Sequence, residues 1–339
     1  MRKRTTLILA VSLLVVLMVG ALSGCSLTKK KKDTFTVGWS TDTMAQPWRA
    51  YLTETIQKEW AKNSKVKLVT VEAQGKTEKQ ISDIEDLIAQ KVDLIMASPK
   101  EEGALTAVIA KANKAGIPVV LADRGVQGDQ FTTRVKMDNY VIGQAAAQYL
   151  AKKLNGKGNI VIIEGVPGAT TVVETQQGFL DELKKYPNMK VLASQPADYR
   201  RDKGMQVMEN YLQAYKQIDA VFSHADEMTM GALVAAKNAK REKQIVWASI
   251  NATMEFIKEL KDGNIVGCSP LRSNTAVVAV KVATKVLNKE KVPQVYIMPV
   301  KMVDETNAAK LYDANRYSLD PWDPEAEGLK IQTQDKASK

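Results

Sequence analysis

Short apolar runs alternate with longer amphipathic stretches from residue 35 onward, and this alternation restricts the fold more than any other feature. Apolar runs of this length are typical of buried strands, and apolar residues every three or four positions are typical of helices. The predicted strands cover 35–40, 66–71, 92–97, 117–122, 159–164, 189–194, 220–223, 244–249, 265–268 and 295–298. The predicted helices cover 47–61, 77–90, 101–115, 139–154, 171–186, 202–214, 228–239, 253–260 and 275–287. Such alternation predicts βαβ units with parallel sheets, and its restart at residue 139 predicts two similar α/β lobes. The residues after 315 are rich in proline and charge and predict an irregular tail.

One strand ends in a pair of charged residues that suits a ligand. The run 119–125, VVLADRG, carries an apolar strand directly into Asp123 and Arg124. Ligands of open α/β sheets bind outside the carboxyl ends of the strands. A carboxylate accepts hydroxyl hydrogen bonds and a guanidinium donates them, which matches the adjacent hydroxyls of a sugar or polyol. The alternative is an ordinary surface pair.

Charge and composition exclude several function classes. The net charge is +10, but Arg2, Lys3, Arg4 and the lysines at 29–32 account for seven of these charges. The remainder is close to neutral and has no basic stripe with interleaved aromatics, so we expect no nucleic-acid partner. Two cysteines, Cys25 and Cys268, and one histidine argue against a disulfide framework and against zinc. Metals held by oxygen ligands are not excluded by these counts, but the acids show no calcium-loop spacing, and we predict no metal site and no cofactor.

The first 33 residues are typical of export. Residues 1–24 combine a basic start with an uncharged apolar run, as in a secretory signal peptide. The tetrapeptide that ends at Cys25 reads Leu-Ser-Gly-Cys and resembles the lipobox of bacterial lipoproteins. That resemblance implies cleavage before Cys25 and its lipidation, palmitate included, whereas the alternative is a single membrane-spanning anchor. Lysine-rich residues 25–33 would form a flexible tether.

Several strings, in order, resemble the periplasmic sugar-binding proteins of the ribose and galactose type, the solute receptors of ABC importers. The strongest is 193–199, ASQPADY, which is followed by Lys-Gly and Val-Met pairs. Ala-Asp-Arg at 122–124, FSHADEM at 222–228 and Lys-Val-Leu at 285–287 are further strings of this kind. The resemblance covers residues 35 to 303.

This resemblance implies the type 1 periplasmic binding protein fold: two Rossmann-like α/β lobes joined by a three-stranded hinge, with one ligand between them. It places the hinge near Lys136, Pro270 and Pro299. Lobe one would be 34–136 plus 271–298, lobe two 137–270 plus 299–315, and the tail 316–339.

The resemblance also implies ligand contacts in the first lobe. Gln46, Trp48 and Arg49 stand where the family has Asn-Pro-Phe-Phe or a similar string. An aromatic ring here can stack on the apolar face of a sugar. Arg49 resembles instead the Trp-Arg of galactofuranose-binding relatives. The alternatives are core packing for Trp48 and a solvated helix face for Arg49.

In the second lobe, Tyr199 stands at the family's ligand-stacking Phe, and Arg201 again resembles the galactofuranose type. Both residues could instead cap a loop. Asn251 occupies the family's Asp position. Ala225, which follows His224, stands where the family has an amide residue that contacts the ligand. His224 either takes over that ligand contact or is packed inside the protein. The family's Arg in the next helix aligns with Val173, and its hinge-side Gln aligns with Pro270. These departures leave the identity of the sugar open.

The predicted function is an exported, membrane-tethered solute-binding protein that captures a monosaccharide or polyol and delivers it to an ABC permease. It would act as a monomer in the cell envelope, on the outer face of the cytoplasmic membrane or in the periplasm. Sugar acids or phosphorylated sugars are the alternative ligands, because Arg49, Arg124 and Arg201 could make the cleft cationic. A sensor that presents its closed form to a membrane receptor kinase is the alternative role. No G-x-G-x-x-G follows the first strand and no G-x-S-x-G occurs, so we predict no catalytic residues and no enzyme activity.

Overall fold

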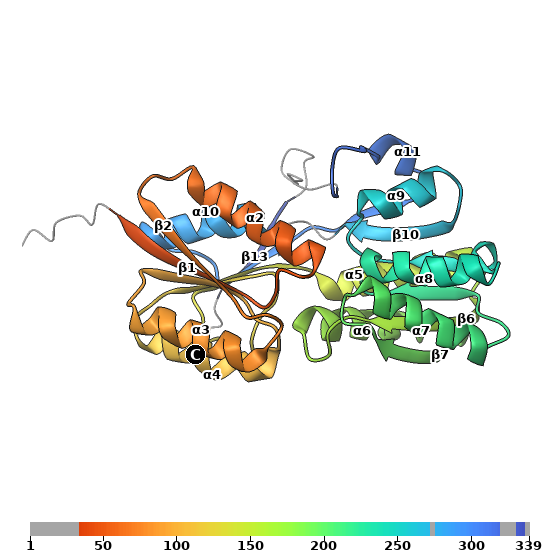
Figure 1. The fold of residues 1–339 in the computed structure, drawn as a ribbon, viewed down its shortest axis with the longest axis horizontal. Helices are drawn as coiled ribbons and strands as arrows, with labels where there is room; N and C mark the ends of the chain where they lie inside the picture. The colour runs from red at the N-terminus through yellow and green to blue at the C-terminus, as the bar shows by residue number, and fades with distance from the viewer. Residues whose placement is uncertain (1–33, 272–274, 319–329, 336–339) are drawn as a thin grey trace, which may run out of the picture. The chain divides into compact units, whose positions relative to one another are not determined.

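The structure is a computed structural model that describes residues 34–271, 275–318 and 330–335. The predicted signal peptide, Cys25 and the tether lie outside the described residues. Two sheets organise the chain, and each is covered by helices on both faces (Figure 1). This arrangement confirms the predicted α/β fold with two lobes and mostly parallel sheets.

The first lobe contains a seven-stranded sheet in the order β13-β11-β5-β4-β3-β1-β2. Its strands are β1 (Phe35–Thr41), β2 (Val66–Glu72), β3 (Leu94–Ser98), β4 (Val119–Ala122), β5 (Thr133–Met137), β11 (Val295–Met298) and β13 (Gln332–Gln334). Its helices are α2 (Pro47–Ala61), α3 (Thr77–Ala89), α4 (Glu102–Lys114) and α10 (Ala276–Leu287). Since β1 lies between β2 and β3, the connections leave β1 and β3 in opposite directions, which opens a crevice at their carboxyl ends.

The second lobe contains a six-stranded sheet in the order β12-β10-β9-β8-β6-β7. Its strands are β6 (Lys157–Glu164), β7 (Asn188–Pro196), β8 (Ala220–Ser223), β9 (Val246–Ala248), β10 (Val266–Leu271) and β12 (Lys301–Asp304). Its helices are α5 (Asn139–Lys153), α6 (Thr170–Leu183), α7 (Arg201–Ala214), α8 (Asp226–Asn238), α9 (Met254–Lys261) and α11 (Ala308–Leu311), with a 3₁₀ turn at Glu242–Gln244.

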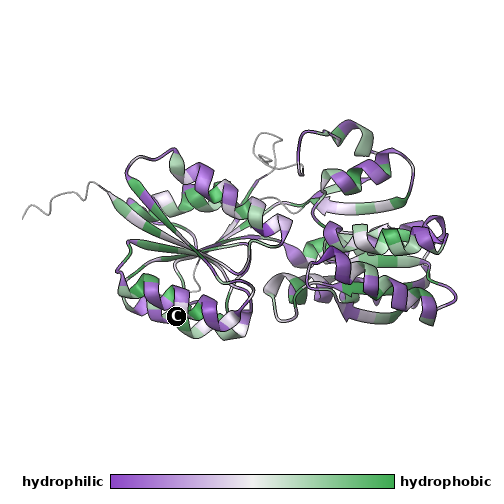
Figure 2. Cartoon of the chain, in the orientation of Figure 1, coloured by the Kyte–Doolittle hydropathy of each residue, from purple (hydrophilic) through white to green (hydrophobic). Residues whose placement is uncertain are grey.

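Successive side chains of the buried strands face different cores, as the pleat requires. In β6, Ile160 and Ile162 pack toward α5 and α6, whereas Val161 and Ile163 pack toward α7 and α8. Figure 2 shows the sheets as mainly hydrophobic and the outer helix faces as mainly hydrophilic. Among the described helices, none is both long enough and apolar enough to cross a bilayer.

The predicted elements match the observed ones to within three residues at each end, and three strands and the short helix α11 were missed. The missed strands are β5, β12 and β13. Strand β13 pairs antiparallel with β11, so the prediction of an irregular tail was wrong at this point. Its pairing also extends the first sheet by one edge strand.

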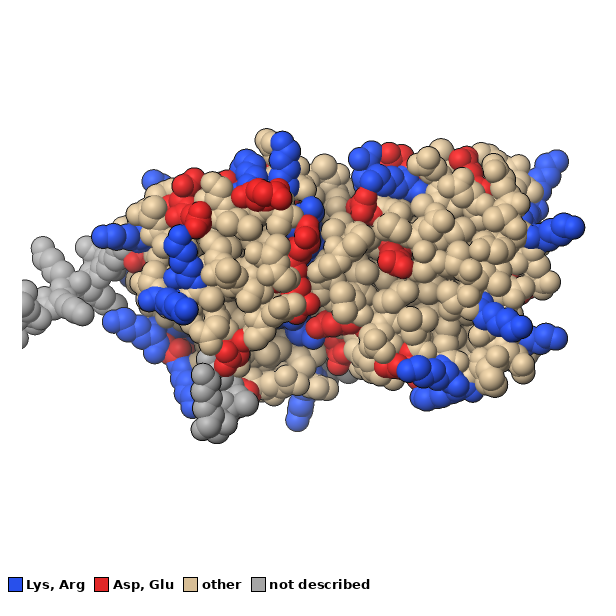
Figure 3. Space-filling model, turned by 90° about the horizontal axis from the view of Figure 1, so that it is seen from below, with Lys and Arg blue, Asp and Glu red and all other residues tan. Residues whose placement is uncertain are grey.

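The chain passes between the two sheets at three places: after β5, after β10 and between β11 and β12. Contacts near these passages tie the lobes together, because Glu174 of α6 forms ion pairs with Lys136 and Arg134 of β5. The face in Figure 3 carries scattered Lys and Arg side chains without a continuous basic stripe.

Candidate functional site

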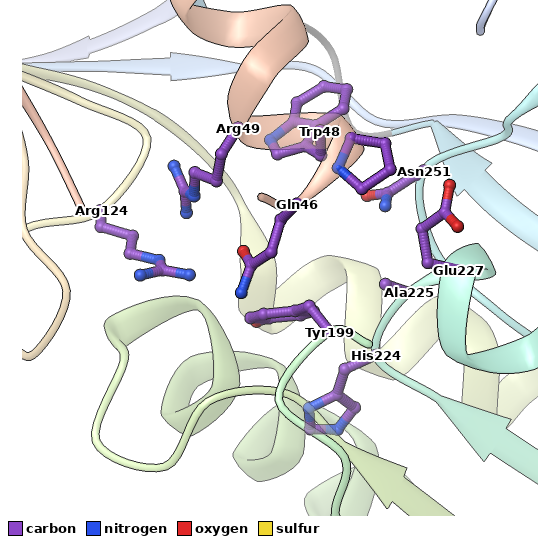
Figure 4. A pocket seen from close by; sticks show the side chains of 10 residues that line it. Gln46, Trp48, Arg49, Arg124, Tyr199, His224, Ala225, Glu227 and Asn251 are labelled. Atoms are coloured by element: carbon purple, nitrogen blue, oxygen red, sulfur yellow. The ribbon is translucent and has the colours of Figure 1, made fainter. Parts of the chain in front are cut away.

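A narrow cavity of about 20 Å³ lies between the two lobes, which is room for about one water molecule, so a larger guest requires the lobes to move apart. Its walls come from the start of α2 and from loops that follow the carboxyl ends of strands in both sheets. In Figure 4, Trp48 and Tyr199 lie on opposite sides of Gln46, with the arginines at one end and Glu227 at the other. The lining residues are Gln46, Pro47, Trp48, Arg49, Arg124, Tyr199, His224, Ala225, Glu227 and Asn251.

Two buried arginines are held by two buried aspartates at the first-lobe end of the pocket. Arg49 Nη2 donates to Asp123 Oδ2 at 2.9 Å, and its Nη1 donates to Ser98 Oγ at 2.8 Å. Arg124 Nη1 donates to Asp42 Oδ2 at 2.9 Å. Arg49 is thus an internal residue at 2% exposure, which excludes the solvated helix face considered for it.

Backbone geometry explains how the pair at 123–124 reaches this position. Asp123 directly follows β4 and has a φ of +68°, in the left-handed region that side chains other than glycine rarely adopt. Its N–H donates to Val135 O, and its own carbonyl accepts from the Arg134 guanidinium. The turn therefore directs Asp123 to Arg49, while Arg124 lines the pocket.

Burial and the nearby carboxylates act in opposite directions on the pKa of each arginine. Burial and the nearby Arg124 lower the pKa of Arg49, while Asp123 and Asp42 oppose that change. Burial also acts to lower the pKa of Arg124, but the Asp42 carboxylate and other nearby groups outweigh it, so the pKa is raised. Both guanidiniums stay charged at neutral pH, and their two positive charges are matched by two carboxylates.

Three buried donor atoms at the pocket lack hydrogen-bond partners among the described residues: Arg124 Nε, Arg124 Nη2 and Trp48 Nε1. Buried polar groups in folded proteins nearly always have a partner. A guest with several oxygen atoms would satisfy these donors.

Aromatic rings line the pocket from both lobes. Trp48 comes from the first turn of α2, and Tyr199 comes from the loop before α7. The Arg124 guanidinium lies 5.7 Å from the centre of the Tyr199 ring. Gly165 makes room for this ring, because a Cβ added there would lie 2.2 Å from Tyr199 Cζ. Both rings therefore have positions from which they can stack on the guest.

Gln46 bridges the lobes across the pocket, since its Nε2 donates to Asp198 O at 3.0 Å. His224 also lines the pocket, and its Nε2 lies 3.0 Å from Gln176 Oε1. Asn251 lines the pocket with a φ of +116°, and its N–H donates to Pro270 O. These contacts fix the second-lobe side of the cavity.

Arg201 does not line this pocket. Its guanidinium pairs with Glu255 and with Glu227, and its side chain is 47% exposed beside a larger, more open hollow. Asp123 does not line the pocket itself, but its carboxylate forms an ion pair with Arg49, which does. Val173 and Pro270, which stand where the family has Arg and Gln, do not line the pocket either, since Val173 is exposed and Pro270 belongs to β10.

Sequence reasoning missed two acidic residues of the site. Asp42 directly follows β1, just as Asp123 directly follows β4, so the same signal was present there. Glu227 lies in the first turn of α8, after β8, and faces the pocket. A search for charged residues after every predicted strand would have found both.

Comparison with known proteins places this geometry in context. Residues 37–291 match the family described as periplasmic binding protein domain. The ribose import binding protein RbsB of Bacillus subtilis is 34% identical over 303 residues, which cover 86% of this chain and 98% of that protein. The galactofuranose-binding protein YtfQ of Escherichia coli is 33% identical over 269 residues, covering 77% of this chain and 84% of that protein.

A solved structure agrees with these matches. The fructose-binding periplasmic domain of a hybrid two-component system superposes with a TM-score of 0.77 at 30% identity. The alignment covers 81% of this chain and 92% of that domain.

Proposed function

Because the chain belongs to the periplasmic binding protein family, whose members bind solutes, we propose that it captures a neutral monosaccharide or polyol in the pocket between its lobes. The observation that carries this proposal is the combination of unpartnered buried donors with two aromatic rings. Sugar hydroxyls accept from such donors, while the apolar face of a sugar ring stacks on an aromatic ring.

Within this proposal, Arg124 and Trp48 donate to guest oxygens, and Trp48 and Tyr199 cover the faces of the ring. Glu227, Asn251 and Gln46 offer oxygen atoms to guest hydroxyls. Asp42 and Asp123 hold the arginines in place, and His224 supports the second-lobe wall. Since contacts come from both lobes, the guest would favour the arrangement in which the lobes meet.

Calorimetry on the purified full chain tests the proposal. Neutral pentoses, hexoses and polyols would be titrated beside sugar acids and sugar phosphates. We expect heat from at least one neutral compound, with a dissociation constant of about 1 μM or below. Arg124→Gln should abolish this heat, whereas Lys58→Gln, a change of an exposed residue on α2, should preserve it. Heat from no compound, or from anions alone, would overturn the proposal.

The proposed setting is the cell envelope, with the protein tethered through a lipid on Cys25 and handing its guest to an ABC permease as a monomer. The lipobox-like tetrapeptide and the ribose import relative support this setting. Mass spectrometry of protein extracted from membranes should find a lipidated Cys25 as the first residue. Cys25→Ser should release the protein from the membrane fraction.

A sensor role is the second candidate, and the similar domain of a hybrid two-component system favours it. The two roles differ in the partner that binds the sugar-loaded protein. Crosslinking in membranes should capture a permease for transport and a receptor kinase for sensing.

A further inference from the structure

The segment at 317–318 is attached to the second lobe beside the pocket. Tyr317 O accepts from Met254 N, at the start of α9, at 2.8 Å. Ser318 forms an isolated antiparallel bridge with Thr253. These backbone contacts hold the Tyr317 side chain at a defined place, although Tyr317 itself does not line the pocket.

The Tyr317 ring reaches the first lobe through a second tyrosine. Its centre lies 5.5 Å from that of Tyr51 on α2, with an interplanar angle of 44°. The Tyr51 ring in turn lies 6.1 Å from Trp48, at 51°. Both separations are within the range of favourable aromatic pairs. A chain of three rings therefore connects the C-terminal segment to the wall of the pocket.

The Tyr317 hydroxyl reaches the other end of the pocket. It donates to Glu227 Oε1 at 3.4 Å, while Arg201 Nη2 donates to Glu227 Oε2 at 3.1 Å. Both oxygens of this pocket-lining carboxylate are therefore held. Burial, with the nearby Glu227 carboxylate, raises the pKa of Tyr317, so the hydroxyl keeps its proton at neutral pH and remains a donor.

We propose that Tyr317 is a positioning residue of the pocket, which orients Glu227 through its hydroxyl and Trp48 through the ring of Tyr51. This proposal rests on the proposed function, because Glu227 and Trp48 would contact the bound sugar. Arg201 would orient Glu227 in the same way, through its hydrogen bond to the second carboxylate oxygen. The segment at 317–318, which follows α11 of the second lobe in the chain, thus helps to set which hydroxyl pattern the pocket accepts.

Tyr317→Phe tests the hydroxyl route, because it removes the donor and keeps the ring. Calorimetry should show about fivefold weaker binding of the preferred sugar, a smaller effect than for an ideal charged hydrogen bond, because the 3.4 Å separation exceeds the usual range of about 2.5–3.0 Å. In a Glu227→Ala background the same change should have no further effect, because residues in one network are not additive. Tyr312→Phe is the matched control, since Tyr312 belongs to the same region but packs against Lys261. Equal affinities for Tyr317→Phe and wild type, or full additivity with Glu227→Ala, would overturn the hydroxyl route.

Tyr317→Leu tests the ring route without a sugar. In a ¹H–¹⁵N spectrum of the full chain, the indole signal of Trp48, assigned with Trp48→Phe, should shift in Tyr317→Leu and stay in place in Tyr312→Leu. An unmoved Trp48 signal overturns the ring route. If the wild type binds no sugar at all, the proposed function fails, and this signal still decides whether Tyr317 positions Trp48.

Discussion

Asp42 offers the sharpest test of how the arginines are held. Its carboxylate and the Arg124 guanidinium are 2.9 Å apart, and their side chains are only 2% and 1% exposed. Asp42→Asn removes the charge and keeps a similar shape. Arg124 would retain the neutral amide oxygen at position 42, a 3.3 Å hydrogen bond to Lys100 O and the face of Tyr199. Breaking a buried ion pair lowers the free energy of unfolding by about 3–5 kcal/mol. Because asparagine keeps an amide oxygen that can accept from Arg124, we expect a loss of about 3 kcal/mol for this variant.

Urea unfolding of the full chain measures this loss as a lower midpoint with an unchanged slope. Asp202→Asn is the control, because the Arg200–Asp202 pair is shorter, at 2.6 Å, but both side chains are more than half exposed. We expect no measurable change for the control, since exposed ion pairs are screened by water. Equal effects of the two substitutions would refute the reasoning that burial, and not distance, decides the contribution.

Two further predictions concern the lobe contact and a buried acid. Glu174→Gln removes the ion pair with Lys136 that joins the two lobes. Because this contact should stabilise the sugar-bound arrangement of the lobes, we expect sugar binding to weaken about threefold to tenfold in calorimetry. An unchanged affinity would contradict this. Burial raises the pKa of Asp226 from 3.8 to about 7, against hydrogen bonds that include those from Thr253 N and Ser269 Oγ. Because the folded pKa is the higher one, the stability that protonation contributes is complete below pH 3.8 and lost as the pH rises through about 7. Asp226→Asn should flatten this decline in urea titrations across that range, and an unchanged slope would exclude Asp226 as its source.

Elements with continuous apolar runs were predictable because their residues alone specify burial. All five residues of β3 and all four of β4 are buried. Strand β5 was missed because Arg134 and Lys136 interrupt its apolar pattern, and both contact Glu174 of the other lobe. Strand β13 has only exposed polar residues, so its local sequence has no strand pattern. It is a strand because it pairs with β11 in the fold.

The site was predictable where a residue directly follows a strand, since topology alone brings these positions together. The position of Arg201 was not, because its partner Glu255 is distant in sequence and competes for the guanidinium. The role proposed for Tyr317 was not predictable for the same reason, since Tyr51 and Glu227 are distant from it in sequence and contact it only in the folded chain.

The charges around the pocket favour a neutral guest over a sugar acid. Arg49 and Arg124 are matched by Asp123 and Asp42, and Glu227 adds a further carboxylate at the opposite end. An anion would therefore meet two arginines whose charge is already balanced, and it would lose its hydration without a new ion pair in return. A hydroxyl oxygen needs only the unpartnered N–H groups of Arg124 and Trp48. Sugar affinity should then change little with ionic strength, whereas Asp42→Asn, which leaves one guanidinium unbalanced, should increase the affinity for a sugar acid relative to the neutral sugar. A steep loss of wild-type affinity with salt would show that a free guanidinium, and not a balanced pair, holds the guest.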